Sequence, residues 1–119
     1  MGSVAFYHYT DTRGKDGIVS SGYIREKPAG NKYAHFGPGT YGTSLAPSPG
    51  SNRIIAQNNW QSHWESNIRN GRMDWAIKVQ VPAHMVRRCG AEQGRDILVH
   101  SGRLYLNNYG YQVVRGPTS

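Results

Sequence analysis

His35-Phe36-Gly37-Pro38-Gly39-Thr40-Tyr41-Gly42-Thr43-Ser44 is the stretch from which the rest of the chain is best interpreted. Its glycines and proline indicate a turn, because glycine adopts positive φ and lets a ligand approach the bare backbone. Tyr41 follows this turn, and a tyrosine ring placed there can stack on a flat heterocycle. The alternative is an ordinary loop that leads into a strand with a half-buried tyrosine. The flanking segments favour the first interpretation.

The length of 119 residues fits one domain, over residues 1–119, with a single core. Fifteen glycines and eight tyrosines favour strands joined by many turns. We therefore expect an α+β or mostly β domain. Met1-Gly2-Ser3 is typical of a cloning remnant, in which case the domain was cut from a longer protein.

Fourteen Lys and Arg residues against seven Asp and Glu residues give a formal net charge of +7. Such a charge attracts phosphate-bearing partners over a long range. The cations are spread along the chain without long runs, so a solvated surface explains them equally well. The charge therefore permits a nucleic-acid partner without requiring one.

Cys89 is the only cysteine, so an internal disulfide cannot form, and we expect it to act as a small hydrophobic residue. No apolar run approaches the length that crosses a membrane, and the first residues lack a signal-peptide core. We expect an intracellular protein without a membrane partner, either a monomer or part of a larger chain.

Periodic patterns predict strands over 4–10, 74–82, 96–100, 104–106 and 109–114, with Tyr41 on or beside a further strand. One helix is expected from Asp11 or Thr12 to about Ser20, and a second from Asn52 to about Asn67. Trp60, Trp64 and Ile68 recur every fourth residue of the second helix and form an apolar stripe for the core. The pattern predicts two small packed sheets with helices at one side.

Three separated motifs carry a resemblance to a known family: Tyr7-His8-Tyr9-Thr10, Gly37-x-Gly39-x-Tyr41 and Leu106-Asn107-Asn108-Tyr109. In this order they resemble the ADP-ribosyltransferases of the diphtheria-toxin and poly(ADP-ribose)-polymerase type. The beginning of the chain is most similar to a small single-domain subgroup with a His-Tyr-Asp signature, a relative of rifampin ADP-ribosyltransferase. The resemblance covers nearly the whole chain and is strongest over residues 4–45.

The resemblance implies an α+β fold with a split β-sheet core, two short helices and a cleft that binds NAD. It implies that His8 hydrogen-bonds a ribose hydroxyl, that the Tyr9 backbone holds the nicotinamide amide, and that Tyr41 stacks on the nicotinamide ring. Further contacts to NAD are expected from Thr10, Gly39, Thr43 and Ser44. An enzyme of this kind breaks the nicotinamide–ribose bond and passes ADP-ribose to an acceptor.

The chemistry of these residue types agrees with those roles. Cleavage of the glycosidic C–N bond builds positive charge on the ribose, so the site must hold the ribose and exclude competing water. A neutral imidazole can donate to or accept from a hydroxyl, and a tyrosine ring can cover one face of nicotinamide. The other four histidines have no spacing typical of a metal site, so we expect no metal and place them in structural or surface positions: His35, His63, His84 and His100.

The third motif departs from the family pattern. Polymerising relatives carry a glutamate where this chain has Asn108, and an amide can neither ionise nor act as a general base. This disfavours elongation of an ADP-ribose chain. Asp96 is an alternative acid for the third catalytic position, and Asp74 and Glu92 are weaker candidates.

The sequence therefore predicts a mono-ADP-ribosyltransferase that uses NAD as its substrate, with His8, Tyr41 and Asn108 as catalytic residues. The acceptor stays open among nucleic acid, protein and small molecules. One alternative is an NAD glycohydrolase, in which water replaces the acceptor. The other is a non-catalytic module with a degenerate site that binds ADP-ribose or nucleic acid.

Overall fold

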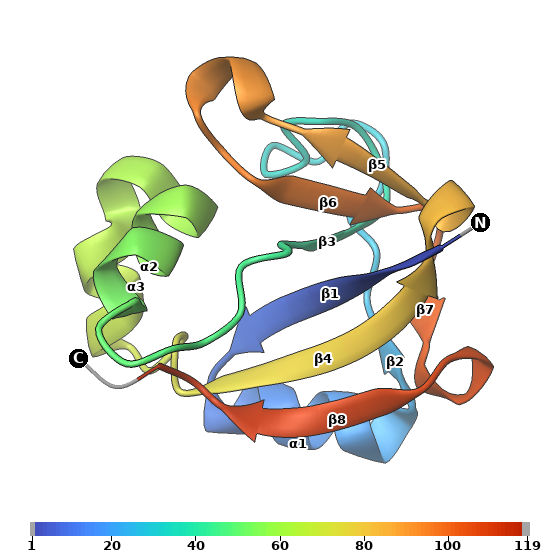
Figure 1. Ribbon diagram of the computed structural model, residues 1–119, viewed down its shortest axis with the longest axis horizontal. Helices are drawn as coiled ribbons and strands as arrows, with labels where there is room; N and C mark the ends of the chain where they lie inside the picture. The colour runs from blue at the N-terminus through green and yellow to red at the C-terminus, as the bar shows by residue number, and fades with distance from the viewer. Residues whose placement is uncertain (1, 118–119) are drawn as a thin grey trace.

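The computed structural model describes residues 2–117, which form an α+β fold (Figure 1). The strands are β1 (Ser3–Thr10), β2 (Tyr23–Ile24), β3 (Thr40–Gly42), β4 (Trp75–Pro82), β5 (Val86–Cys89), β6 (Ile97–His100), β7 (Leu104–Tyr105) and β8 (Tyr111–Arg115). The α-helices are α1 (Thr12–Ser21), α2 (Asn52–Trp60) and α3 (Trp64–Arg69). Short 3-10 turns are η1 (Gln61–His63), η2 (Ala83–Met85), η3 (Ala91–Gln93) and η4 (Leu106–Asn108).

The strands form two three-stranded antiparallel sheets, in the orders β1-β4-β8 and β3-β6-β5, and a smaller pair, β2-β7. A single bridge joins the two larger sheets, where the Tyr7 N–H donates to the Thr43 carbonyl at 2.8 Å and the Thr43 N–H donates back at 3.0 Å. Of the chain around β3, only Thr43 pairs with β1, and β3 itself pairs with β6. Beyond Tyr7 this edge of β1 therefore has no strand partner among residues 2–117.

The two faces of the first sheet support two separate core clusters, because successive side chains of a strand point to opposite faces. Phe6 and Ile77 face the second sheet and pack with Leu98 and other buried aliphatic residues. Tyr7 and Tyr9 face α2, where they pack with Ile55 and its neighbours. Because β1 contributes side chains to both clusters, packing on both faces of the sheet fixes the residues at its free edge.

The expected strand over 4–10 and helix after Asp11 are confirmed. The Asp11 side chain accepts a hydrogen bond from the Gly14 N–H at 2.7 Å and so caps α1, as aspartate commonly does at helix starts. The expected single helix over 52–67 is wrong, because the chain breaks at Gln61, which has a φ of 51°. Residues 2–117 thus contain three α-helices where two were expected, although Trp60, Trp64 and Ile68 still pack against one cluster.

No strand was expected between residues 82 and 96. Instead Val86–Cys89 forms β5, which pairs with β6 at the outer edge of the second sheet. The expected strand over 104–106 ends at Tyr105, and Leu106–Asn108 is a 3-10 turn. Among the described residues, no helix has the length and apolarity needed to cross a membrane.

Candidate functional site

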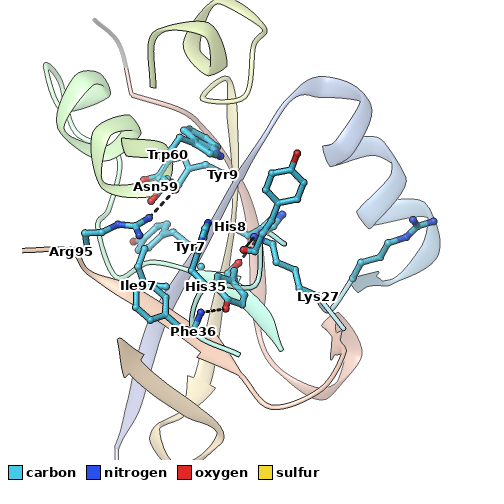
Figure 2. Close-up of a pocket in the computed structure, with 14 residues that line it drawn as sticks. Tyr7, His8, Tyr9, Lys27, His35, Phe36, Asn59, Trp60, Arg95 and Ile97 are labelled. Carbon is cyan, nitrogen blue, oxygen red and sulfur yellow. Dashed lines mark hydrogen bonds between the residues drawn. The ribbon is translucent and has the colours of Figure 1, made fainter. Parts of the chain in front are cut away.

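A cavity of about 160 Å³ lies at the free edge of β1 (Figure 2). It is lined by Tyr7, His8, Tyr9, Arg25, Lys27, Tyr33, His35, Phe36, Tyr41, Gly42, Asn59, Trp60, Arg95 and Ile97. Its volume is below the about 300–1,000 Å³ that encloses a drug-sized ligand, so it can enclose only part of a larger molecule. Aromatic rings and three cations line it, and none of its lining residues is acidic.

His8 stands on β1 beside Tyr41 of β3. Its Nδ1 lies 2.9 Å from the Tyr41 carbonyl oxygen, which can only accept, so Nδ1 carries the proton. Burial lowers the pKa of His8, the hydrogen bond to Tyr41 partly opposes this, and the charge of Lys27 lowers it further. The ring is therefore neutral near pH 7, and its Nε2 is an acceptor that can receive a hydroxyl proton.

The Tyr41 ring is fixed at its hydroxyl end. The hydroxyl accepts from the Phe36 N–H at 2.8 Å and donates to the Gly37 carbonyl at 2.7 Å. Burial raises the pKa of Tyr41 despite the opposing hydrogen bond from Phe36, so the phenol stays protonated. A ring anchored in this way presents a stable surface for a flat ligand.

Lys27 closes over the same ring. Its ammonium lies 4.3 Å from the Tyr41 ring centroid and donates to the Tyr33 carbonyl at 3.2 Å. Its backbone pairs with Gly39 through two hydrogen bonds of 2.7 and 3.0 Å. Burial, followed by the charge of Arg95, lowers the pKa of Lys27. These contacts attach the segment between β2 and β3 to the wall of the cavity.

The backbone of Tyr9 offers hydrogen-bonding groups to the cavity. Both backbone groups of Tyr7 bond to Thr43, away from β4, and backbone groups two residues apart on a strand point the same way. The Tyr9 N–H and C=O therefore point to the free edge of β1, where residues 2–117 provide no strand partner. Buried backbone groups are nearly always paired, so these are suited to an amide ligand.

The edge of β1 divides the cavity into two ends. His8 and Lys27 lie on one side of the β1 ribbon, and Trp60 and Arg95 lie on the other (Figure 2). A more open groove adjoins the first end, shares His8 and Arg25 with the cavity and runs along α1. A molecule too long for the cavity can therefore continue from His8 into this groove.

The sequence that forms this cavity matches a family of enzymes. A family model described as “HYD1 signature containing ADP-ribosyltransferase” matches residues 6–100, which is most of the chain. The chain belongs to this family of ADP-ribosyltransferases. No curated protein and no solved structure matches it. The family resemblance expected from the motifs is confirmed, and the relationship to rifampin ADP-ribosyltransferase stays a prediction.

Enzymes of the ADP-ribosyltransferase family use NAD as their substrate. Three of the residues expected to bind it line the cavity together, namely His8, Tyr9 and Tyr41. Thr10 lies in the adjoining groove. A planar aromatic wall, a neutral imidazole and free backbone amide groups fit a nicotinamide riboside.

Gly39, Thr43 and Ser44 lie outside the cavity lining of this ADP-ribosyltransferase. A Cβ on Gly39 would stand 2.5 Å from Val99 Cγ1 and 2.6 Å from the His100 carbonyl oxygen, and its φ is 142°. Only glycine fits there, so its role is the close packing of the turn on β6. It contributes to the site by positioning Tyr41.

Thr43 and Ser44 bind a carboxylate. The Ser44 N–H donates to Asp96 Oδ1 at 3.0 Å, the Thr43 hydroxyl donates to the same oxygen at 3.2 Å, and the Ser44 hydroxyl donates to Oδ2. Asn58 binds both backbone groups of Asp96, at 2.6 and 2.9 Å. Asp96 thus fastens the end of β3 to β6 and α2. Its two neighbours in the sequence, Arg95 and Ile97, line the cavity.

The structure does not bring Asn108 to the cavity. Asn108 is exposed in η4, and Asp74 and Glu92 also lie outside the lining residues. Of the four histidines expected in structural or surface positions, His35 lines the cavity, which the sequence did not indicate. Among residues 2–117 no group of three His, Cys, Asp or Glu residues has the arrangement of a metal site.

Sequence reasoning missed several lining residues, of which Lys27, Trp60 and Arg95 are the most informative. Lys27 and Arg95 carry no sequence signal, because they lie in connecting segments that have no periodic pattern. Trp60 was assigned to the core by its spacing. It does pack against the core, but the helix break at Gln61 places it at the end of α2, where it also faces the cavity.

The neutral state of His8 predicts a pH dependence. Its pKa lies below 6.5, and protonation would turn Nε2 from an acceptor into a donor. Nicotinamide release should therefore be constant near neutral pH and fall only in acidic solution, below the pH at which an ordinary histidine is protonated, with one protonation. The pH profile of the rate measures this. A decline centred above pH 6.5 would contradict the role of neutral His8.

Proposed function

We propose that this ADP-ribosyltransferase is a mono-ADP-ribosyltransferase whose reaction takes place in the cavity at the free edge of β1. The observation that carries the proposal is the grouping of a neutral His8, the fixed Tyr41 ring and the unpaired backbone of Tyr9. Each offers what one part of nicotinamide riboside needs: an acceptor for a ribose hydroxyl, a stacking surface and a partner for the carboxamide.

The reaction breaks the bond between the nicotinamide nitrogen and ribose C1′. The bonding electrons leave with nicotinamide, which becomes neutral, and positive charge develops on the ribose. A nucleophilic atom of the acceptor then bonds to C1′ and releases its proton to water. His8 holds the ribose through Nε2, and Tyr41 keeps the departing ring in line, so both act mainly by positioning.

The rest of NAD is expected to extend from His8 into the groove along α1. Arg25 lines both spaces, and Arg13 lines the groove, so two guanidinium groups are available to the diphosphate. Thr10 also lines this groove. Gly14 lets α1 pack closely against Thr10, because a Cβ on residue 14 would stand 2.0 Å from the Thr10 hydroxyl oxygen. This course leaves the Trp60 end of the cavity free for the acceptor.

For the third position of the signature, Asp96 is the better candidate than Asn108. The matched region, 6–100, contains His8, Tyr41 and Asp96 in that order and ends before Asn108. The Asp96 carboxylate accepts hydrogen bonds from Thr43 and Ser44. We assign it a positioning role, in which it holds the end of β3 and hence Tyr41 and Gly42 at the cavity.

A pair of substitutions tests this assignment. Asp96→Asn keeps the shape but replaces one charged acceptor oxygen by a donor, so it should lower nicotinamide release about 10-fold or more. Asn108→Ala removes an exposed side chain outside the cavity and should change the rate less than about 2-fold. Steady-state rates at saturating NAD, with thermal unfolding as a folding control, measure both. A large loss in Asn108→Ala alone would reverse the assignment.

The fate of the ADP-ribose group tests the proposed function against its alternatives. The protein is incubated with NAD labelled in the adenylate part, in the presence of protein, DNA and RNA, while nicotinamide and labelled macromolecules are followed separately. A mono-ADP-ribosyltransferase releases nicotinamide and leaves single ADP-ribose groups on one class of acceptor. Free labelled ADP-ribose alone would identify an NAD glycohydrolase, and NAD binding without cleavage would identify a binding module.

A further inference from the structure

The end of the cavity at Trp60 has features that nicotinamide riboside at Tyr41 does not use. Trp60 closes this end from the last turn of α2, and Arg95 closes it from the loop before β6. Figure 2 shows both side chains across the β1 ribbon from His8 and Lys27. With the remainder of NAD in the groove along α1, this end is left for the molecule that receives ADP-ribose.

The walls of this end suit a flat, aromatic ligand. Three rings, those of Tyr7, Phe36 and Trp60, line the cavity there, and the Arg95 guanidinium lies 5.7 Å from the Phe36 ring centroid. Asn59 adds an amide at the rim, with its Oδ1 accepting from Asn58 at 2.9 Å. Aromatic rings, a guanidinium plane and an amide are the groups that proteins use to stack on and hydrogen-bond unpaired nucleobases.

Arg95 is held in place by the backbone of α2. Its Nε donates to the Asn58 carbonyl at 2.9 Å, and its Nη2 donates to the Asn59 carbonyl at 3.2 Å. Because both partners are neutral carbonyls, its positive charge is not neutralised. Because Arg95 is fixed beside the aromatic walls, its guanidinium can bind an anionic group there.

The charge around the cavity favours a phosphate-bearing acceptor. Arg95 lies at this end, no lining residue of the cavity is acidic, and among residues 2–117 the single ion pair is Lys15–Asp16, elsewhere on the surface. The whole chain carries +7. An acidic protein segment would satisfy the charge but would leave the aromatic walls without a matching partner.

We propose that the Trp60–Arg95 end of the cavity binds a nucleobase of single-stranded nucleic acid, which is the acceptor of ADP-ribose. This inference rests on the proposed function. A base must leave its stack to enter the cavity, and an unpaired strand meets this requirement without the cost of opening a duplex. A nucleophilic ring or exocyclic nitrogen of that base bonds to ribose C1′ as nicotinamide leaves, and its proton passes to water.

Substitution at Trp60 tests the proposal with a matched control. Trp64 is a tryptophan of the neighbouring α3 that packs on the same core cluster but does not line the cavity. The unsubstituted protein, Trp60→Leu, Trp60→Phe and Trp64→Leu are each given adenylate-labelled NAD. The acceptors are single-stranded DNA, single-stranded RNA, duplex DNA and an acidic polypeptide, and thermal unfolding verifies that each variant is folded.

We expect label on a single-stranded oligonucleotide, little on duplex, and a steep decline with added salt. In Trp60→Leu the ratio of labelled oligonucleotide to released nicotinamide should fall about 10-fold, because stacking is lost and water captures the ADP-ribose. Trp60→Phe keeps an aromatic face and should restore most of the ratio. Trp64→Leu should leave it unchanged.

Two kinds of result separate failure of this inference from failure of the proposed function. Release of nicotinamide with label on the polypeptide, or on no polymer, would overturn the nucleic-acid acceptor and leave the cleavage of NAD intact. An equal loss of release and transfer in Trp60→Leu would make Trp60 an NAD contact and also overturn the inference. No nicotinamide release under any condition would overturn the inference together with the proposed function.

Discussion

Tyr41→Ala is expected to lower nicotinamide release from NAD by about 10- to 100-fold. The ring is the flat surface on which we propose that nicotinamide stacks, and stacking of a base on an aromatic side chain contributes about 1–3 kcal/mol. Each 1.4 kcal/mol lost from transition-state binding lowers the rate about tenfold. Initial rates at low NAD concentration measure the effect, because they report kcat/KM.

Tyr41→Phe separates the ring from its hydroxyl. It keeps the stacking surface but loses the two hydrogen bonds that hold the ring, to the Phe36 N–H and the Gly37 carbonyl. Its rate should lie between those of the unsubstituted protein and Tyr41→Ala. If both variants lost the same activity, anchoring of the turn rather than stacking would be the function of Tyr41.

His8→Ala should have an effect at least as large, about 100-fold or more. It removes the Nε2 acceptor proposed to hold the ribose and also the hydrogen bond to the Tyr41 carbonyl that joins β1 to β3. Loss of a well-positioned contact that strengthens in the transition state commonly costs several kcal/mol. The measurement is kcat at saturating NAD, since the contact aligns the ribose for cleavage.

His8→Asn distinguishes the two functions of this histidine. An asparagine amide can reproduce the Nδ1–H that donates to the Tyr41 carbonyl but does not reach the position of Nε2. We expect it to unfold at a temperature close to that of the unsubstituted protein and to be as inactive as His8→Ala. His84→Asn, an exposed histidine outside the cavity, serves as the control and should retain full activity. An active His8→Asn would assign His8 a structural role only.

Much of the first half of the fold could be predicted from local sequence. Strand β1 has the aromatic and β-branched composition typical of a buried strand, and Asp11 is a standard helix cap. The glycine-rich turn correctly predicted Tyr41 on or beside a strand, because glycine and proline mark the turn that precedes β3. In each case neighbours in the sequence determine the structure.

The parts that were missed depend on contacts between distant segments. β5 has too few apolar residues to show a strand pattern, and its pairing with β6 defines it. The break at Gln61 has no glycine to mark it, since a non-glycine residue adopts the positive φ there. Asn108 was aligned by a short motif near the end of the chain, and the tertiary structure places it on the surface.

The cavity itself could be predicted only in part, for the same reason. His8, Tyr9 and Tyr41 lie in motifs, whereas Lys27 and Arg95 reach the cavity from loops whose paths no local pattern defines. Lys27 is brought there by its backbone pairing with Gly39, twelve positions along the chain, and Arg95 by its hydrogen bonds to the end of α2. Long-range hydrogen bonds of this kind leave no periodic signal in the sequence.

The most direct test of the central claim is a time course of nicotinamide release from NAD by the purified protein and by a variant that combines His8→Asn with Tyr41→Ala. The claim predicts that the unsubstituted protein releases nicotinamide as NAD disappears, and that the folded double variant does so no faster than a sample without protein. NAD that stays intact with the unsubstituted protein, or equal release by the double variant, would contradict the claim that the cavity at His8 and Tyr41 cleaves NAD.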